Sequence, residues 1–265
     1  MIFEELIKVD VLQPIISMIY EGKLTLEADG SISLKRQIDP NSPWVFKGTP
    51  TDRDSTKWLG VYFRCYQLIP RTCHSCFKVV MKPETLEDLF KVWKLQMKTE
   101  LASKCGLENR SFVRSKGYAA YWYCPIAGGL EEARSWFKKI KTKVKEQGIK
   151  GEIYLKKGCA EMELAVGPSD KWVHTTEHER LEYMLDQIFL QPPDRTPQPA
   201  HQVIHVQRLW IERAWQRGDE TVFNFAEANR FQPPPIHYED SDHEAKDSPI
   251  FLPNWMDEAK DGANN

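Results

Sequence analysis

The sequence predicts an α+β fold on three observations. Between residues 77 and 157, short apolar runs bounded by turn residues alternate with two segments whose apolar residues recur every three or four positions. Beyond Pro168 the pattern changes to that of helices alone. The length of 265 residues is enough to bury a sizeable core, as one large domain or two small ones.

The first seventy residues predict a helix, a hairpin and a strand. Apolar residues at helical spacing stop near Pro14, because a proline breaks a helix interior. Asp29-Gly30, between two alternating runs, is the favoured signal for a type I′ hairpin turn. The expected elements are a helix over residues 1–20, strands over 23–28 and 31–35, a loop over 37–57 and a strand over 57–69.

The middle of the chain predicts a regular alternation of strands and helices. Thr85 is expected to cap the first helix, with Asp88 in the capping-box position. The second helix follows the Gly128-Gly129 turn and carries lysines on its outer face. The expected elements are strands over 77–81, 111–115, 118–124 and 152–156, helices over 86–101 and 130–145, and an added strand over 161–166.

The order strand, helix, strand, strand, helix, strand is the split βαβ, or ferredoxin-like, plan. Two further helices are expected over residues 174–189 and 201–217, separated by a Pro-rich break. The chain is therefore predicted to have four regions: an N-terminal helix, hairpin and strand over 1–70, a ferredoxin-like cysteine-site core over 71–168, a helical region over 169–230 and an acidic Pro-containing tail over 231–265.

Five cysteines are predicted to meet at one edge of the ferredoxin-like sheet. In this plan Cys73 and Cys76 precede the first strand, Cys105 ends the first helix, Cys124 ends the third strand and Cys159 follows the fourth. Thiolates aimed at one point bind zinc or a [4Fe-4S] cluster. The expected ligands are Cys73, Cys76, Cys105 and Cys159, with Cys124 as a substitute for one of them. The alternative is that the cysteines fill the core, which suits Cys65 and Cys124.

The charge distribution predicts a contact with nucleic acid. Residues 71–159 hold 19 Lys or Arg against 9 Asp or Glu, although the whole chain has a net charge of −2. A basic middle with acidic flanks suits a protein that meets phosphate on one face. The second helix is expected to supply the main contact through Lys138, Lys139, Lys141 and Lys145. The alternative is a solvated surface on which the acidic tail folds back.

Residues 116–123, Lys-Gly-Tyr-Ala-Ala-Tyr-Trp-Tyr, resemble the signature strand of RNA-recognition-motif domains. Ala120 stands where that family places a base-stacking aromatic residue, and Tyr121 replaces an aliphatic one. The resemblance covers residues 77–157 and implies a nucleic-acid contact at Lys116, with Tyr118 and Trp122 stacked on bases. The alternative is that these rings pack beneath neighbouring segments.

Further signals concern catalysis and location. The sequence contains no Ser/His/Asp arrangement, P-loop or dinucleotide fingerprint. The first residues are acidic where a signal peptide would be basic, and no apolar run is long enough to span a bilayer. We therefore expect a cytoplasmic protein without a membrane contact, in which clustered cysteines bind metal rather than form disulfides.

The function predicted from these signals is a metal- or iron–sulfur-stabilised, nucleic-acid-binding or assembly subunit of a larger complex. Residues 239–261 combine eight acidic residues with an apolar group and predict docking to a protein partner. Two alternatives stay open. One is an iron–sulfur enzyme or electron-transfer protein, and the other is a structural assembly protein without a nucleic-acid contact.

Overall fold

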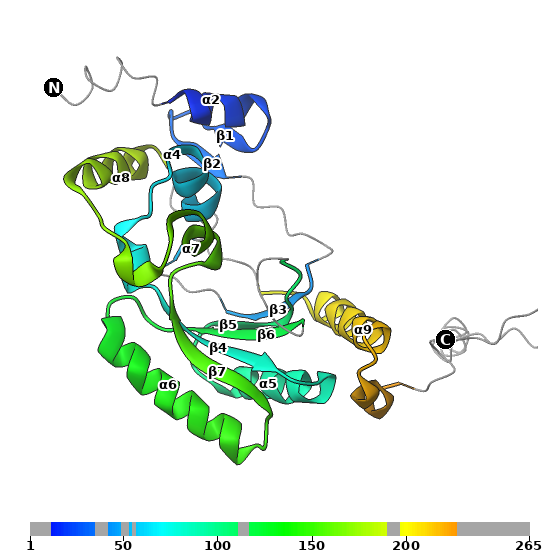
Figure 1. Ribbon diagram of the computed structural model, residues 1–265. Helices are drawn as coiled ribbons and strands as arrows, with labels where there is room; N and C mark the ends of the chain where they lie inside the picture. Colours follow the sequence, from blue (N-terminus) through cyan, green and yellow to red (C-terminus); the bar gives the residue numbers. More distant parts are fainter. Residues whose placement is uncertain are drawn as a thin grey trace, which may run out of the picture. The chain divides into compact units, whose positions relative to one another are not determined.

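The computed structural model describes residues 12–34, 42–48, 53–54, 57–110, 117–189 and 197–226 (Figure 1). These residues belong to one compact unit that spans residues 1–226. They form both helices and strands, which confirms the predicted α+β class. No helix in this part of the chain is long and apolar enough to cross a membrane.

The described strands form two sheets. They are β1 (Leu24–Leu26), β2 (Ile32–Leu34), β3 (Trp44–Lys47), β4 (Phe77–Pro83), β5 (Ser103–Leu107), β6 (Tyr118–Tyr123) and β7 (Gly151–Lys157). β1 and β2 pair as a hairpin. The other five form a central sheet in the order β3-β5-β6-β4-β7, in which every neighbouring pair is antiparallel.

Helices and short helical turns connect the strands. The helices are α2 (Gln13–Tyr20), α4 (Arg64–Tyr66), α5 (Leu86–Lys98), α6 (Gly129–Glu146), α7 (Ala160–Val166), α8 (Thr176–Ile188) and α9 (Ala200–Gln216). A π-helical segment, η1 (Trp58–Phe63), precedes α4, and 3-10 turns form η2 (Arg71–Ser75), η3 (Ser169–Lys171) and η4 (Glu220–Asn224). Figure 1 shows α5 and α6 on one side of the central sheet and α7 on the other.

Local signals explain several of these boundaries. The Thr85 hydroxyl accepts a hydrogen bond from the Asp88 N–H at 3.1 Å, so Thr85 caps α5 as predicted. The hairpin turn lies between β1 and β2 where it was predicted, but it is not of type I′, because Gly30 adopts φ +83° whereas Asp29 does not have a positive φ. The Asp29 carboxylate accepts from the Ser31 N–H at 2.9 Å and closes this turn.

The region before β4 differs from its prediction. Residues 57–69, predicted as a strand, are helical in η1 and α4, and Trp58, Val61 and Tyr62 are buried together at helical spacing. The expected loop over 37–57 contains β3, which lengthens the central sheet. Pro14 lies at the start of α2 and does not break it, because the first turn has no hydrogen bond for proline to remove. Residues 1–11 of the expected helix lie outside the described residues.

Two predicted strands beyond β4 are also wrong or unsupported. α5 ends at Lys98, and the next described strand is β5, which the sequence did not predict. The expected strand over 111–115 lies outside the described residues. Residues 161–166 were predicted as a strand and form α7 instead. Met162 is buried there, and Gly167 with φ +92° ends the helix.

Candidate functional site

The two faces of the central sheet differ in chemistry because neighbouring residues of a strand point to opposite sides. We call the side covered by α5 and α6 the helix face. It carries Val79, Met81 and Trp122, which are fully buried. We call the other side the pocket face. It carries a small cluster of Val80, Ala119 and Tyr121, with the rings of Trp44, Tyr123 and Tyr154 packed against it.

Tyr118 and Trp122 lie on the helix face and are buried. The Trp122 indole N–H donates to the Thr99 hydroxyl at 3.2 Å, just beyond the end of α5. The Tyr118 hydroxyl donates to the Asp219 carboxylate at 2.8 Å, and burial with this bond raises its pKa. The sequence left two interpretations open for these rings, namely stacking on bases and packing beneath neighbouring segments. In the structure, Tyr118 and Trp122 both pack beneath neighbouring segments.

The pocket face combines aromatic rings with cations in strand register. Lys78 lies opposite Tyr123 on β6 and opposite Lys156 on β7. Two residues further along β4, on the same face, Val80 lies opposite Tyr121 and Tyr154. Residues opposite each other in antiparallel strands share a face, so cations and rings from three strands stand side by side.

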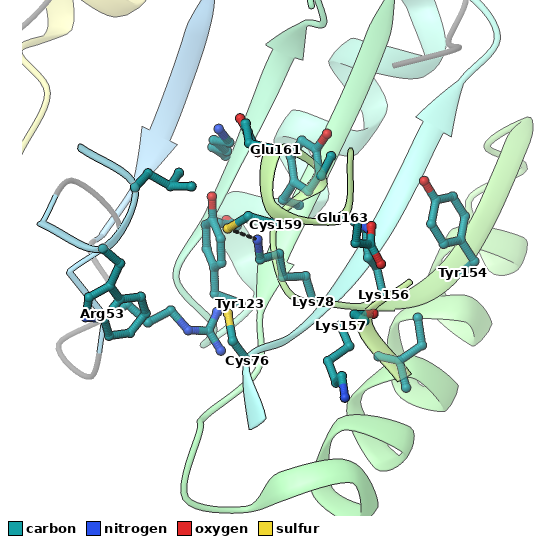
Figure 2. A pocket seen from close by; sticks show the side chains of 18 of the residues that line it. Arg53, Cys76, Lys78, Tyr123, Tyr154, Lys156, Lys157, Cys159, Glu161 and Glu163 are labelled. Atoms are coloured by element: carbon teal, nitrogen blue, oxygen red, sulfur yellow. Dashed lines mark hydrogen bonds and ion pairs between the residues drawn. The ribbon is translucent and has the colours of Figure 1, made fainter. Parts of the chain in front are cut away.

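A cavity of about 710 Å³ opens on the pocket face, within the size range of small-molecule sites (Figure 2). It lies between the central strands and the segment that leads into α7. Its lining is strongly basic, with only two acidic side chains from α7. The charged lining residues are Arg53, Lys78, Lys82, Lys104, Arg110, Lys156 and Lys157, with Glu161 and Glu163.

Several of these cations have carboxylate partners. Arg110 contacts Glu108 at 2.6 Å and Glu161 at 2.5 Å, and the hydrogen bond to Glu108 is the main reason that the Arg110 pKa is raised. Lys82 contacts Glu152 at 3.0 Å, and Lys156 is ion-paired with Glu163.

Three further lining lysines have no such partner. Within the described part of the chain, no carboxylate oxygen lies within 4.0 Å of the ammonium groups of Lys78, Lys104 or Lys157. Lys104 lies over the rings of Trp44 and Tyr121, at 4.3 and 5.2 Å from their centroids. The cavity therefore keeps an excess of positive charge that side chains of this region do not neutralise.

Lys78 is one of two buried cations in the lining, with 9% of its surface exposed against 8% for Arg53. Its Nζ contacts the Cys159 Sγ at 3.3 Å (Figure 2). Burial lowers the pKa of Lys78, whereas the neighbouring Cys159 and Cys76 raise it, and the pKa is raised overall. The close hydrogen-bond partner of this buried side chain is therefore a sulfur atom.

Four of the predicted cysteine ligands lie near the same end of the central sheet. Cys73 is in η2, Cys76 directly precedes β4, Cys124 directly follows β6 and Cys159 directly precedes α7. Burial raises the pKa of Cys73, and the neighbouring Cys76 and Cys159 raise it further. The backbones also meet here, because the Gly158 N–H donates to the Cys76 carbonyl at 2.9 Å. All six cysteines lie outside disulfides.

Cys105 is not part of this group. It was expected at the end of the first helix, but it lies in the middle of β5, opposite Val45 and Ala120. Burial alone raises its pKa. Cys65, expected in a strand, is half-buried in α4, where its Sγ lies 3.5 Å from the Met18 sulfur. In the described ranges no group of three or more His, Cys, Asp or Glu is placed to hold a metal ion, so the zinc or [4Fe-4S] site stays a prediction.

The lysines predicted to contact nucleic acid lie on the exposed side of α6, away from the cavity. Lys138, Lys139, Lys141 and Lys145 are all exposed. Lys139 lies 4.6 Å from the Trp136 ring centroid, which anchors one of these side chains on its own helix. Lys116 and the predicted docking tail over 231–265 lie outside the described residues.

Sequence reasoning missed the pocket face, although a signal for it was present. In β4, Lys78 and Lys82 are four positions apart, and in β7, Tyr154 and Lys156 are two positions apart. Period-two spacing of basic and aromatic residues places them on one face of each strand. The ferredoxin-like plan already placed the third and fourth strands beside the first, but the sequence did not provide the residue register that aligns these faces.

Comparisons with known proteins add no further constraint. A scan against family models finds no matching family, and searches of curated proteins and of solved structures find no match. The functional argument therefore rests on the geometry of the pocket face.

Proposed function

We propose that the protein binds a single strand of nucleic acid on the pocket face of its central sheet. The observation that carries this proposal is the cavity in which tyrosine rings and unneutralised lysines stand in register on neighbouring strands. Bases stack on aromatic rings, and lysines attract the phosphates between the bases.

The topology supports the same proposal. We propose that β4, α5, β5, β6, α6 and β7 form a ferredoxin-like domain. The strand order β5-β6-β4-β7 and the antiparallel pairing favour this arrangement. In RNA-recognition motifs, a four-stranded sheet of this kind stacks bases on aromatic side chains. Here the available rings are Tyr123 and Tyr154, not the buried Tyr118 and Trp122.

The size of the cavity favours a single strand over a duplex. A volume of about 710 Å³ accepts groups of the size of a nucleotide, whereas a duplex presents its bases only at the groove edges. Stacking on Tyr123 or Tyr154 requires an unpaired base with a free ring face. The proposed ligand is therefore a strand with unpaired bases.

The test is a titration of a fluorescent single-stranded oligonucleotide, followed by anisotropy at several salt concentrations. Tyr154→Ala should weaken binding by roughly fivefold to a hundredfold, the loss typical of one stacked base. Tyr183→Ala is the matched control, since Tyr183 is an exposed tyrosine on α8. Lys104→Gln should reduce the salt slope by about 0.7, the value for one lost phosphate contact with a single strand.

Two results would contradict the proposal. One is the absence of salt-dependent binding to both DNA and RNA strands. The other is equal loss of affinity in Tyr154→Ala and Tyr183→Ala, which would separate the binding from the pocket face.

A further inference from the structure

We infer that the buried part of the cavity around Lys78 is a subsite for a terminal phosphate monoester, so that the protein binds the end of a nucleic-acid strand. This inference rests on the proposed function and specifies which part of the strand enters the cavity. It is carried by the burial of Lys78, its lack of a carboxylate partner and its like-charged neighbours.

The first step is the charge balance of Lys78. A buried ammonium group is stable only when an anion or several hydrogen-bond acceptors replace its water. In the described structure the close partner of the Lys78 Nζ is the Cys159 sulfur, at 3.3 Å, and no carboxylate oxygen lies within 4.0 Å. A thiol is a weak acceptor, so the ammonium group has capacity for an anionic ligand.

The second step is the grouping of like charges. Lys156 lies opposite Lys78 across the β4-β7 pair and lines the same cavity. Burial lowers the pKa of Lys156, and the charge of Lys78 lowers it further. Glu163 neutralises Lys156, but no carboxylate oxygen lies within 4.0 Å of the Lys78 Nζ in the described ranges. A multiply charged anion would relieve this repulsion.

The third step distinguishes a terminal phosphate from an internal one. A phosphate monoester carries about −1.5 to −2 charges at pH 7, and a terminal group has three oxygens free to accept hydrogen bonds. An internal diester carries a single charge. A strand end can also place its phosphate at a buried residue while the rest of the strand leaves the cavity. Tyr123 lies opposite Lys78, and Tyr154 lies opposite Val80, two residues further along β4, so a ring lies near the position of the terminal base.

The experiment compares three oligonucleotides of one sequence that end in a 5′-phosphate, a 3′-phosphate or hydroxyls only. One phosphorylated end should bind at least about tenfold more tightly than the hydroxyl form, the gain from a charge-assisted hydrogen bond. Lys78→Met should abolish this difference, so that all three oligonucleotides bind the variant equally. Lys82→Met is the matched control on the same strand, since Lys82 is already paired with Glu152, and it should keep the difference.

Each failure has a distinct meaning. Equal binding of all three oligonucleotides would overturn the terminal subsite and leave the proposed function standing. No binding of any of them would contradict the proposed function itself. If a nucleoside monophosphate displaces the phosphorylated oligonucleotide as well as the oligonucleotide does, the ligand is a free nucleotide and the strand-end assignment is wrong. The wild-type comparison decides the matter even if Lys78→Met does not fold.

Discussion

The helix face and the pocket face of the central sheet are built from alternate residues of the same strands, yet they have opposite chemistry. Val79 and Trp122 are fully buried under the helices, whereas their neighbours Lys78 and Tyr123 line a basic cavity. Each of these strands therefore contributes to both the core and the candidate site. Adjacent residues of the strand alternate between packing under the helices and lining the cavity. Substitutions at adjacent residues should therefore have effects of different kinds.

The largest effect is expected for Trp122→Ala on the helix face. This change removes a fully buried ring and its hydrogen bond to Thr99, and it should lower the free energy of unfolding by about 3–5 kcal/mol. Urea denaturation followed by circular dichroism measures this loss. Tyr123→Ala, one residue away on the pocket face, should cost clearly less because that ring is only partly buried. Equal losses would contradict the distinction between the faces.

The next effect concerns Asp219, which ties η4 to the helix face. Its carboxylate accepts from the Leu86 N–H at 2.7 Å, at the start of α5, and from the Tyr118 hydroxyl. Asp219→Ala should lower the free energy of unfolding by about 1–2 kcal/mol, as the loss of a helix cap does. Thermal denaturation of Asp219→Ala beside wild type measures this, and an unchanged melting temperature would contradict it.

The same carboxylate predicts a dependence on pH. Burial would raise the pKa of Asp219, but hydrogen bonds from Thr221, Tyr118 and Leu86 lower it below the ordinary value of 3.8. A lowered pKa stabilises the fold fully above that value, and the contribution is lost as the pH falls through the folded-state pKa. Wild type should therefore lose stability below about pH 4 more steeply than Asp219→Asn does. Parallel acid profiles of the two proteins would show that Asp219 is not the group responsible.

A smaller effect on stability is expected for Lys78→Met on the pocket face. Replacing a buried charge by an apolar side chain of similar length should leave the free energy of unfolding within about 1 kcal/mol of wild type, or raise it. Thermal melts in the absence of ligand make this comparison. A large loss would mean that Lys78 supports the fold rather than a ligand.

The smallest effect is expected for the lysines of α6. Changing Lys138, Lys139, Lys141 and Lys145 to Gln should alter stability by no more than about 0.5 kcal/mol for each position, because all four are exposed. The variant should also keep most of its affinity for a short oligonucleotide. A loss greater than that of Tyr154→Ala would transfer the main contact to α6, as the charge pattern of the sequence predicted.

The sequence predicted the elements with strong local signals. Thr85 and Asp29-Gly30 set the α5 cap and the hairpin turn through contacts within a few residues, so both were found in the expected places. Residues 57–69 and 161–166 were assigned to strands because short apolar runs are ambiguous between strand and helix. Cys105 was predicted at the end of the first helix because that helix was expected to extend beyond Lys98, where α5 ends.

The candidate site was harder to predict, because it depends on pairing between distant segments. Lys78, Tyr123 and Lys156 come together only when β4 lies between β6 and β7. The signature-strand resemblance pointed to Tyr118 and Trp122, which are buried against the helices, whereas Tyr123 of the same strand lines the cavity. Four of the five cysteines predicted to bind metal lie near one end of the central sheet. Metal analysis of the purified protein is the direct test of that prediction.

The central claim is that nucleic acid lies on the pocket face, and ultraviolet cross-linking tests it most directly. A single-stranded oligonucleotide is irradiated with the protein, and the attached peptides are identified by mass spectrometry. We predict adducts on peptides that contain Tyr121, Tyr123 or Tyr154. Adducts confined to α6, or to peptides outside the central sheet, would contradict the account.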